Sequence, residues 1–297
     1  MRHAPLSLPD FLGVGALKAA TTYLDVLLRA HPQLCLPANL KEVQFFNRYS
    51  DRGPEWYASL FSHCDGRRPA GMARTQKRGE ISPQYLSDEG CPGRIAALLP
   101  EVRLVVSVRD PVQRAYSQYK HWVEERGYRE PFETFLAEHP SALARGEYFR
   151  SICRYLDHFP LDQVHVLLAE ELFSGPQPVL RDVFAFLGVD PSAAPAPVAR
   201  PQNVSAVPRF HRLYVGTKRV TRWLYDRGGA RVVDAAKSLG APRLFEPRSP
   251  RRAFKPLTAE TVERLREHYA PDVAGLSDMV GRDLAGYWWG RPGGRRR

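Results

Sequence analysis

Short apolar runs alternate with amphipathic segments along most of the first 190 residues. Residues 11–15 (FLGVG) and 103–108 (RLVVSV) are apolar and bounded by turn residues, which predicts buried strands, and shorter runs at 33–36 and 164–168 predict two more. Helical spacing or helix-capping residues mark the segments between and after these runs, namely 21–30, 55–61, 93–99, 110–126 and 178–187. This alternation predicts an α/β fold of three layers, with a central parallel sheet and helices on both faces.

The pattern changes in the last third of the chain. Prolines and alanines over 190–201 predict a linker or exposed loop, and from Arg209 onward the pattern is mainly helical, with a clear amphipathic helix at 257–268. We expect one domain over residues 1–297. Within it, 190–255 is expected to form a basic helical lid or insert, and the tail 290–297 is expected to be disordered.

Charge favours an anionic partner. The net charge is +11 with a pI near 9.7, and the stretch 209–255 holds 13 Lys and Arg against three acids. Such a balance attracts nucleotides, phosphates, sulfated or acidic molecules, or nucleic acid. The basic stretch fits either a solvated helical face or a lid over an anionic ligand, and the sequence leaves both open.

Cysteine usage and hydropathy bear on the compartment. The cysteines at 35, 64, 91 and 153 show no CxxC spacing, so we expect reduced thiols. No stretch approaches the roughly 18 apolar residues of a membrane span, and the first residues lack the apolar core of a signal peptide. These features predict a cytoplasmic protein without a membrane span; peripheral membrane contact and the oligomeric state are left open.

The segment Gly13–Thr22 (GVGALKAATT) lies between the first strand and the first helix. Backbone N–H groups at a helix start, reinforced by the helix dipole, form an anion site. Lys18 adds a positive charge, and Thr21 and Thr22 add hydroxyl donors. The sequence therefore predicts a P-loop-like phosphate site, the alternative being an ordinary turn with a solvated lysine.

This loop departs from the Walker A pattern, which needs GxxxxGK followed by Ser or Thr. Leu17 takes the place of the second glycine and Ala19 follows the lysine, so the hydroxyl that would hold Mg²⁺ is missing. We therefore expect phosphate binding without a metal. His31, His63 and His121 are not at metal-ligand spacing either, and we expect them to be structural or at the surface.

A second strand–helix junction begins at Arg109, which emerges at the carboxyl end of the strand 103–108. Ligands of open α/β sheets bind outside this end of the strands. Ser117 follows about two helical turns later, so both side chains can grip one phosphate. Taken alone, the pair also fits an arginine bound to Asp110 and a neutral helix serine.

Together these segments resemble the PAPS-dependent sulfotransferases, where PAPS is 3'-phosphoadenosine-5'-phosphosulfate. Lys18-Ala-Ala-Thr-Thr22 resembles the 5'-phosphosulfate loop, and Arg109-Asp-Pro to Ser117 resembles the 3'-phosphate site. Lys41-Glu-Val-Gln-Phe-Phe46 is similar to the KE-x-x-FF motif of the heparan-sulfate-type branch, and Gly79–Tyr85 resembles its substrate-side segment. Further short matches follow in the family's order as far as residues 281–287, so the resemblance covers nearly the whole chain.

The resemblance implies roles for individual residues. The donor-binding residues are Lys18, Ala19, Ala20, Thr21, Thr22, Arg109, Ser117, Arg251 and Arg252. Lys18 is also expected to be catalytic, neutralising charge on the bridging oxygen. Glu42 is expected to be the base, the alternative being a plain ion pair with Lys41 or Arg48. The acceptor-binding residues are Lys41, Gln44, Ser82, Gln84 and Tyr85.

Two residues differ from the family's pattern. Ala20 stands where glycine is usual, and its methyl group limits how closely the backbone can approach an anion. Gln44 stands where histidine is frequent, which is expected to alter contacts with the acceptor.

The expected reaction moves a sulfuryl group from PAPS to a hydroxyl or amine and releases 3',5'-ADP without a metal. The resemblance implies a carbohydrate, glycolipid or glycosylated metabolite as acceptor. A P-loop kinase or NTPase is the main alternative and would require Mg²⁺. A basic nucleic-acid-binding protein is the alternative of another class, although no helix-turn-helix, zinc-finger or RNA-binding motif is visible, so no nucleic-acid partner is expected.

Overall fold

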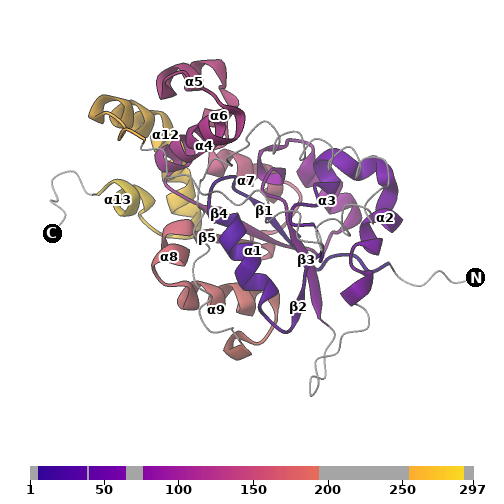
Figure 1. The fold of residues 1–297 in the computed structure, drawn as a ribbon. Helices are drawn as coiled ribbons and strands as arrows, with labels where there is room; N and C mark the ends of the chain where they lie inside the picture. Colours follow the sequence, from indigo (N-terminus) through magenta and orange to yellow (C-terminus); the bar gives the residue numbers. More distant parts are fainter. Residues whose placement is uncertain (1–5, 39, 65–75, 194–253, 291–297) are drawn as a thin grey trace, which may run out of the picture.

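The structure is a computed structural model that describes residues 6–38, 40–64, 76–193 and 254–290. Its centre is a five-stranded sheet in the order β2-β3-β1-β4-β5, and neighbouring strands in this order are parallel. The strands are β1 (Phe11–Gly15), β2 (Leu34–Cys35), β3 (Lys77–Ile81), β4 (Arg103–Val108) and β5 (Val164–Leu168). The predicted α/β fold with a parallel sheet is confirmed (Figure 1).

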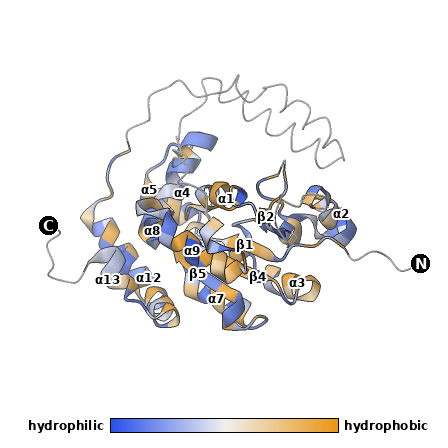
Figure 2. Ribbon diagram, turned by 90° about the horizontal axis from the view of Figure 1, so that it is seen from below, coloured by the Kyte–Doolittle hydropathy of each residue, from blue (hydrophilic) through white to orange (hydrophobic). Residues whose placement is uncertain are grey.

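Helices cover both faces of this sheet. Figure 2 shows α1 (Thr21–Arg29) on one side and α3 (Cys91–Leu98) and α7 (Tyr148–Leu156) on the other. The rings of His31 and Phe184 lie 4.2 Å apart and place the end of α1 beside α9 (Pro176–Leu187). The remaining helices are α2 (Gly53–Ser59), α4 (Pro111–Arg126), α5 (Phe132–Glu138), α6 (Ser141–Ala144), α8 (Ala169–Ser174), α12 (Ala259–Val280) and α13 (Leu284–Trp289).

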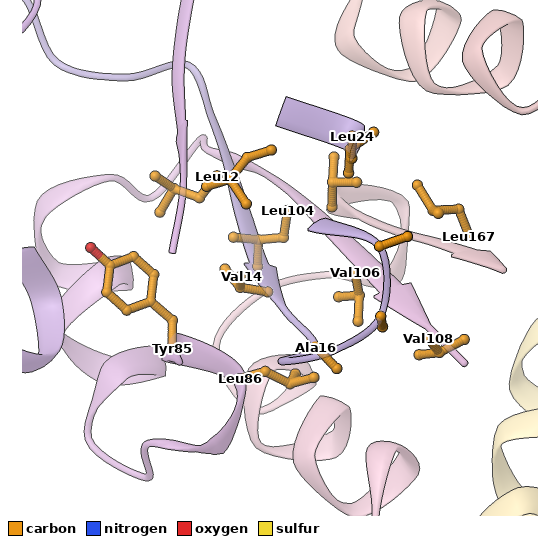
Figure 3. Packing of buried hydrophobic residues seen from close by; sticks show 14 of the residues in the cluster. Leu12, Val14, Ala16, Leu24, Tyr85, Leu86, Leu104, Val106, Val108 and Leu167 are labelled. Carbon is orange, nitrogen blue, oxygen red and sulfur yellow. The ribbon is translucent and has the colours of Figure 1, made fainter. Parts of the chain in front are cut away.

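The core forms where apolar strand residues meet these helices. Strands β1 and β4 are buried almost throughout, as their continuous apolar runs predict for a sheet covered on both faces. Figure 3 shows side chains of β1 and β4 packed between Leu24 of α1 and Tyr85 and Leu86, which follow β3. The core thus fixes β1 and β4, whose carboxyl ends lead into the two predicted phosphate-binding segments.

Several boundaries differ from the sequence predictions. Strands β1, β4 and β5 have the predicted limits, whereas β3 was not predicted as a strand because its sequence KRGEI lacks an apolar pattern. Helix α12 runs to Val280 with Pro271 inside it, well past the predicted end at 268. Most of the predicted lid at 190–255 and of the tail at 290–297 lies outside the described residues.

The prediction of reduced thiols was wrong for one pair of cysteines. Cys35, at the end of β2, forms a disulfide with Cys64, and their Cα atoms are 6.0 Å apart. The fold brings together residues separated by 29 positions, and such a separation leaves no local signal in the sequence. Cys91 and Cys153 are free, and Cys91 is buried.

Two predicted structural histidines have defined surroundings. His31 is buried, and its Nε2 lies 3.0 Å from the carbonyl oxygen of Asp190. His63 is half-buried, with Nε2 3.5 Å from the sulfur of Cys35. In the described ranges, one group has ligand atoms close enough together for a metal ion, namely Cys35, His63 and Cys64. The two sulfurs of this group are, however, joined to each other in the disulfide. Within the same ranges, no helix combines the length and the apolar character that crossing a membrane requires.

Loss of the disulfide is expected to lower stability. For a closed loop of 29 residues, the chain-entropy estimate gives about 3–4 kcal/mol. Urea unfolding should therefore show this loss for Cys35→Ser/Cys64→Ser, and for the wild type in dithiothreitol. The Cys153→Ser protein is the control and should respond to dithiothreitol as the wild type does.

A thiol count in unfolded, non-reduced protein tests the same point directly. Two reactive thiols are expected, and four would contradict the disulfide. Because disulfides are rare in the cytoplasm, this count also bears on the predicted location, which stays a prediction.

Candidate active site

The loop between β1 and α1 is tied to the neighbouring strand β4. The backbone N–H of Ala16 donates to the carbonyl of Ser107 at 2.7 Å, and the Ser107 hydroxyl donates to the carbonyl of Ala19 at 2.5 Å. The first N–H groups of α1 have no acceptor within the helix. The loop therefore has a fixed shape and directs free N–H donors and the positive end of a helix dipole toward one place, as an anion site requires.

Two residues of this loop have left-handed backbone conformations. Lys18 has φ 71° and Ala20 has φ 62°, and Ala20 is the residue before the first turn of α1. A side chain with a Cβ is strained in this region, whereas glycine is not. This strain gives the physical reason why glycine suits position 20, beyond the room for an anion that the sequence indicates.

Lys18 brings a partly desolvated positive charge to the loop. Burial lowers its pKa from 10.5 to about 8, while Glu125, Glu124 and Glu42 act in the opposite direction. Lys18 is therefore mainly protonated at neutral pH, and its charge is weakly screened by water. The first two of these acids lie in the last turns of α4, which sequence reasoning did not connect with the loop.

Lys41 and Glu42 join the same site. The Lys41 ammonium donates to the Thr22 hydroxyl at 2.7 Å and lies 3.3 Å from a carboxylate oxygen of Glu42. Both side chains are half-buried, with exposed fractions of 34% and 28%. The structure thus places the predicted base beside the predicted phosphate loop and at a distance over which Lys18 feels its charge.

Several predicted acceptor residues lie around the buried carboxylate of Glu80. The hydroxyls of Ser82 and Tyr85 donate to it at 2.6 and 2.7 Å, and both residues have no exposed surface. The backbone N–H of Gln44 donates to Ser82 Oγ at 3.0 Å, and Gln84 is half-buried nearby in sequence. The acceptor roles of these four residues stay predictions; the structure shows a positioning contact for three of them.

A second cationic region lies where β4 meets α4. Arg109 forms no ion pair with any residue in the described part of the chain, so the alternative pairing with Asp110 is not seen. Asp110 instead caps α4 by accepting from the N–H groups of Val112 and Gln113. The positive charge at the end of β4 is thus not neutralised by the neighbouring aspartate.

Lys120 belongs to the same cationic region. Burial and the nearby charge of Arg109 both lower the pKa of Lys120, whereas Glu124 raises it. Ser117 lies one turn before Lys120 on α4 and is half-buried. Lys120 was missed, although its spacing of three from Ser117 places both on one helix face.

Phe254 and Lys255, at the end of the basic stretch 209–255, contact this second region. The Tyr116 hydroxyl donates to the carbonyl of Lys255, and the rings of Tyr119 and Phe254 lie 6.4 Å apart. These contacts flank Ser117 on α4. Arg251 and Arg252, the predicted donor-binding residues, lie outside the described residues.

Arg114 illustrates why a motif residue need not touch a ligand. It has no exposed surface, and it donates to Gln118 Oε1 at 2.7 Å and to the carbonyl of Ala142. A buried arginine of this kind joins α4 to α6.

The arrangement as a whole offers two separate cationic regions at the carboxyl edge of the sheet, with a carboxylate beside the first. Such an arrangement suits group transfer from a ligand with two anionic groups.

Comparisons with known proteins agree with this geometry. A family model described as "Sulfotransferase domain" matches residues 8–203. The bifunctional heparan sulfate N-deacetylase/N-sulfotransferase 3 of Mus musculus is 32% identical over 206 residues, covering 62% of this chain and 23% of that protein. The heparan sulfate glucosamine 3-O-sulfotransferase 3B1 of Mus musculus is 29% identical over 290 residues, covering 93% of this chain and 64% of that protein.

A solved structure is similar over nearly all of both chains. It is a sulfotransferase from Alicyclobacillus acidocaldarius, with a TM-score of 0.66 and 26% identity, covering 94% of this chain and 98% of that one. The chain spans less than two thirds of the length of the two heparan sulfate enzymes that it matches.

Replacement of Ala20 by glycine is expected to stabilise the protein. Relief of the left-handed strain is worth about 1–2 kcal/mol, and the greater freedom of the unfolded chain offsets about 0.5–1 kcal/mol of it. Urea unfolding should therefore show Ala20→Gly to be up to about 1 kcal/mol more stable than the wild type.

Ala19→Gly is the matched control, because position 19 does not have positive φ. It should lose stability through the same unfolded-state effect. Equal losses in both variants would show that Ala20 is not strained.

Proposed function

The chain belongs to the sulfotransferase-domain family, and from this premise we propose that it transfers a sulfuryl group from PAPS to a hydroxyl or amine of a carbohydrate-containing acceptor. The observation that carries the proposal is the pairing of two cationic regions at one edge of the sheet. The first contains Lys18, Thr22 and Lys41, and the second contains Arg109 and Lys120. A nucleotide with a 5'-phosphosulfate and a 3'-phosphate carries anionic groups at two ends, as this arrangement requires.

The two regions would divide the donor between them. Lys18, Thr21, Thr22 and the first N–H groups of α1 would hold the 5'-phosphosulfate, and Arg109, Ser117 and Lys120 would hold the 3'-phosphate. The contacts of Tyr116 and Tyr119 with residues 254 and 255 support a role for the end of the basic stretch 209–255 in binding the 3'-phosphate. Each phosphate would then be neutralised by cations that the folded protein already holds in place.

The transfer step needs positioning and charge stabilisation more than covalent chemistry by the protein. In the proposed step, the acceptor oxygen or nitrogen forms a bond to sulfur while the bond from sulfur to the bridging oxygen breaks. Lys18 would stabilise the electron pair left on the bridging oxygen of 3',5'-ADP. Glu42 would take the acceptor's proton, since its carboxylate lies beside the phosphate loop through Lys41 and Thr22.

The proposed acceptor class rests on the relatives. Both curated relatives named above are described as heparan sulfate sulfotransferases, one acting as an N-sulfotransferase and the other as a 3-O-sulfotransferase. A sugar amine or hydroxyl is therefore the acceptor to test first.

Binding of 3',5'-ADP tests the donor assignment. Calorimetry should show tight binding that does not change on addition of Mg²⁺ or EDTA. Arg109→Ala should weaken it, since one charge-assisted contact to the 3'-phosphate is lost, by about tenfold or more. Arg103→Ala is the control, because Arg103 lies at the opposite end of β4.

ATP with and without Mg²⁺ is the matched ligand control. No binding of 3',5'-ADP together with Mg²⁺-dependent binding of ATP would replace this proposal with the kinase alternative. Retention on DNA without binding of either nucleotide would instead favour a nucleic-acid-binding protein.

Lys18 should make donor binding depend on pH. Phosphate groups are fully ionised well above their second pKa of about 6, so between pH 7 and 9.5 the change comes from the protein. Because the pKa of Lys18 is lowered to about 8 in the free protein, 3',5'-ADP affinity should fall as pH rises through 8. Lys18→Met should bind more weakly at pH 7 and lose this part of the pH dependence.

The free energy of unfolding should rise with pH over the range in which the affinity for 3',5'-ADP falls. The folded protein disfavours protonated Lys18, so the stabilising effect of a neutral Lys18 appears as pH rises from about 8 toward 10.5 and is absent below 8. Urea unfolding of the wild type and of Lys18→Met over this range measures the difference. An identical pH dependence of affinity in both proteins would exclude Lys18 from the phosphate site.

A further inference from the structure

The carboxylate of Glu80 lies on β3, beneath the site, and has no exposed surface. Its Oε1 accepts from the hydroxyls of Tyr57 at 2.9 Å and Tyr85 at 2.7 Å, and its Oε2 accepts from the Ser82 hydroxyl at 2.6 Å. The nearby backbone N–H of Val43 lowers the pKa of this carboxyl, as these hydroxyls do. Three hydroxyl donors thus converge on one buried carboxylate, whose lone pairs can accept about four hydrogen bonds.

Two of these hydroxyls also accept from the backbone of the segment that follows Glu42. The N–H of Gln44 donates to Ser82 Oγ at 3.0 Å, and the N–H of Phe46 donates to the Tyr85 hydroxyl at 3.4 Å. Each hydroxyl has one proton, and it points to Glu80. Glu80 therefore holds the backbone at two positions, Gln44 and Phe46, through one hydroxyl at each.

These contacts fix a tight turn of the chain. Gln44 has a left-handed backbone with φ 56° and begins a short π-helix over Phe45–Tyr49. Glu42 lies two residues before it, at the entrance of the turn. A shift of the turn would therefore move the Glu42 carboxylate.

The same cluster is joined to the phosphate loop. The backbone N–H of Ser82 donates to the carbonyl of Gly13 at 2.9 Å, in the strand that leads into the loop. One residue thus contacts β1 through its backbone and the Gln44 turn through its side chain. Glu80, by orienting the Ser82 hydroxyl, sets the position of the turn relative to the loop.

A buried carboxylate is a costly way to fill the space beside a sheet. Burial raises the pKa of Glu80, and only its donors offset the loss of hydration. An apolar side chain could pack against the core at least as well. It could not, however, accept hydrogen bonds from the two hydroxyls that hold the backbone at Gln44 and Phe46.

We propose that Glu80 is a positioning residue for sulfuryl transfer, which holds the turn at Val43–Phe46 so that the Glu42 carboxylate faces the acceptor beside the phosphate loop. The inference rests on the proposed function, because it concerns the placement of the proposed base. Glu80 itself does not touch the reactants.

Glu80→Gln tests the proposal, since it keeps the size of the side chain and replaces one acceptor oxygen with a donor. The initial rate of 3',5'-ADP release from PAPS is measured with heparan sulfate as the probe acceptor. The rate constant should fall by about 100-fold, while the dissociation constant of 3',5'-ADP stays within about twofold of the wild-type value and the KM for heparan sulfate changes little. Hydrogen exchange of a peptide covering 41–49 should become at least about tenfold faster, with the strand 103–108 unchanged.

Two tyrosines give a matched pair of variants. Tyr57 and Tyr85 both donate to Glu80 Oε1. Of the two, Tyr85 also accepts a hydrogen bond from the turn, from the backbone N–H of Phe46. Tyr85→Phe should therefore lower the rate constant and speed exchange at 41–49 in the same direction as Glu80→Gln, while Tyr57→Phe has a much smaller effect on both.

The outcomes separate the two proposals. A wild type that binds no 3',5'-ADP overturns the proposed function. Normal 3',5'-ADP binding with a wild-type rate in Glu80→Gln overturns the positioning role alone. Weaker 3',5'-ADP binding with faster exchange in both peptides also overturns it, because Glu80 would then serve only the general stability of the fold.

Discussion

Strand β1 lies between β3 and β4, and its close packing against β3 is the constraint on which the site depends. A Cβ at Gly15 would lie 2.5 Å from the Cβ of Leu86, and one at Gly13 would lie 2.8 Å from Ile81 Cγ1. Only glycine allows this approach without displacing β3 or the turn after it. The approach brings the residues that follow β3 against the strand that enters the phosphate loop. Because the strands are parallel, the loops after β1, β3 and β4 then meet at one edge, where such folds bind ligands.

Charge at this edge is arranged before any ligand binds. The region at the end of β4 joins Arg109 and Lys120, which repel each other, and the loop after β1 holds the partly desolvated Lys18. Like charges held together in a folded protein cost free energy, and an anionic ligand relieves that cost. The acids Glu42, Glu124 and Glu125 raise the pKa of Lys18, which helps to keep the lysine charged near neutral pH. The charge of the site is therefore complementary to that of an anionic ligand before any ligand binds.

The sequence predicted most of the sheet and the loop around Lys18 because these depend on local patterns. Continuous apolar runs identify β1, β4 and β5, and the strand–loop–helix order locates the loop around Lys18. Strand β3 could not be found this way, since Glu80 interrupts it and is buried only because hydroxyls from positions 57, 82 and 85 converge on it. The Cys35–Cys64 disulfide and the charge of Lys120 near Arg109 also depend on contacts that folding creates. The missed features share this property, since each needs a partner distant in the sequence.

The irregular segment between β2 and α2 explains why a buried acid is needed at all. Residues 36–52 contain neither a strand nor an α-helix in their described part, so their backbone groups find few partners in regular structure. The attachments that hold the segment include the disulfide at its beginning, Lys41 on Thr22, and Glu80 with its hydroxyls on the turn. A regular strand here would satisfy its own N–H groups, but it would continue the sheet instead of turning Glu42 toward the loop. The buried carboxylate thus orders irregular backbone that carries the proposed base beside the predicted phosphate loop.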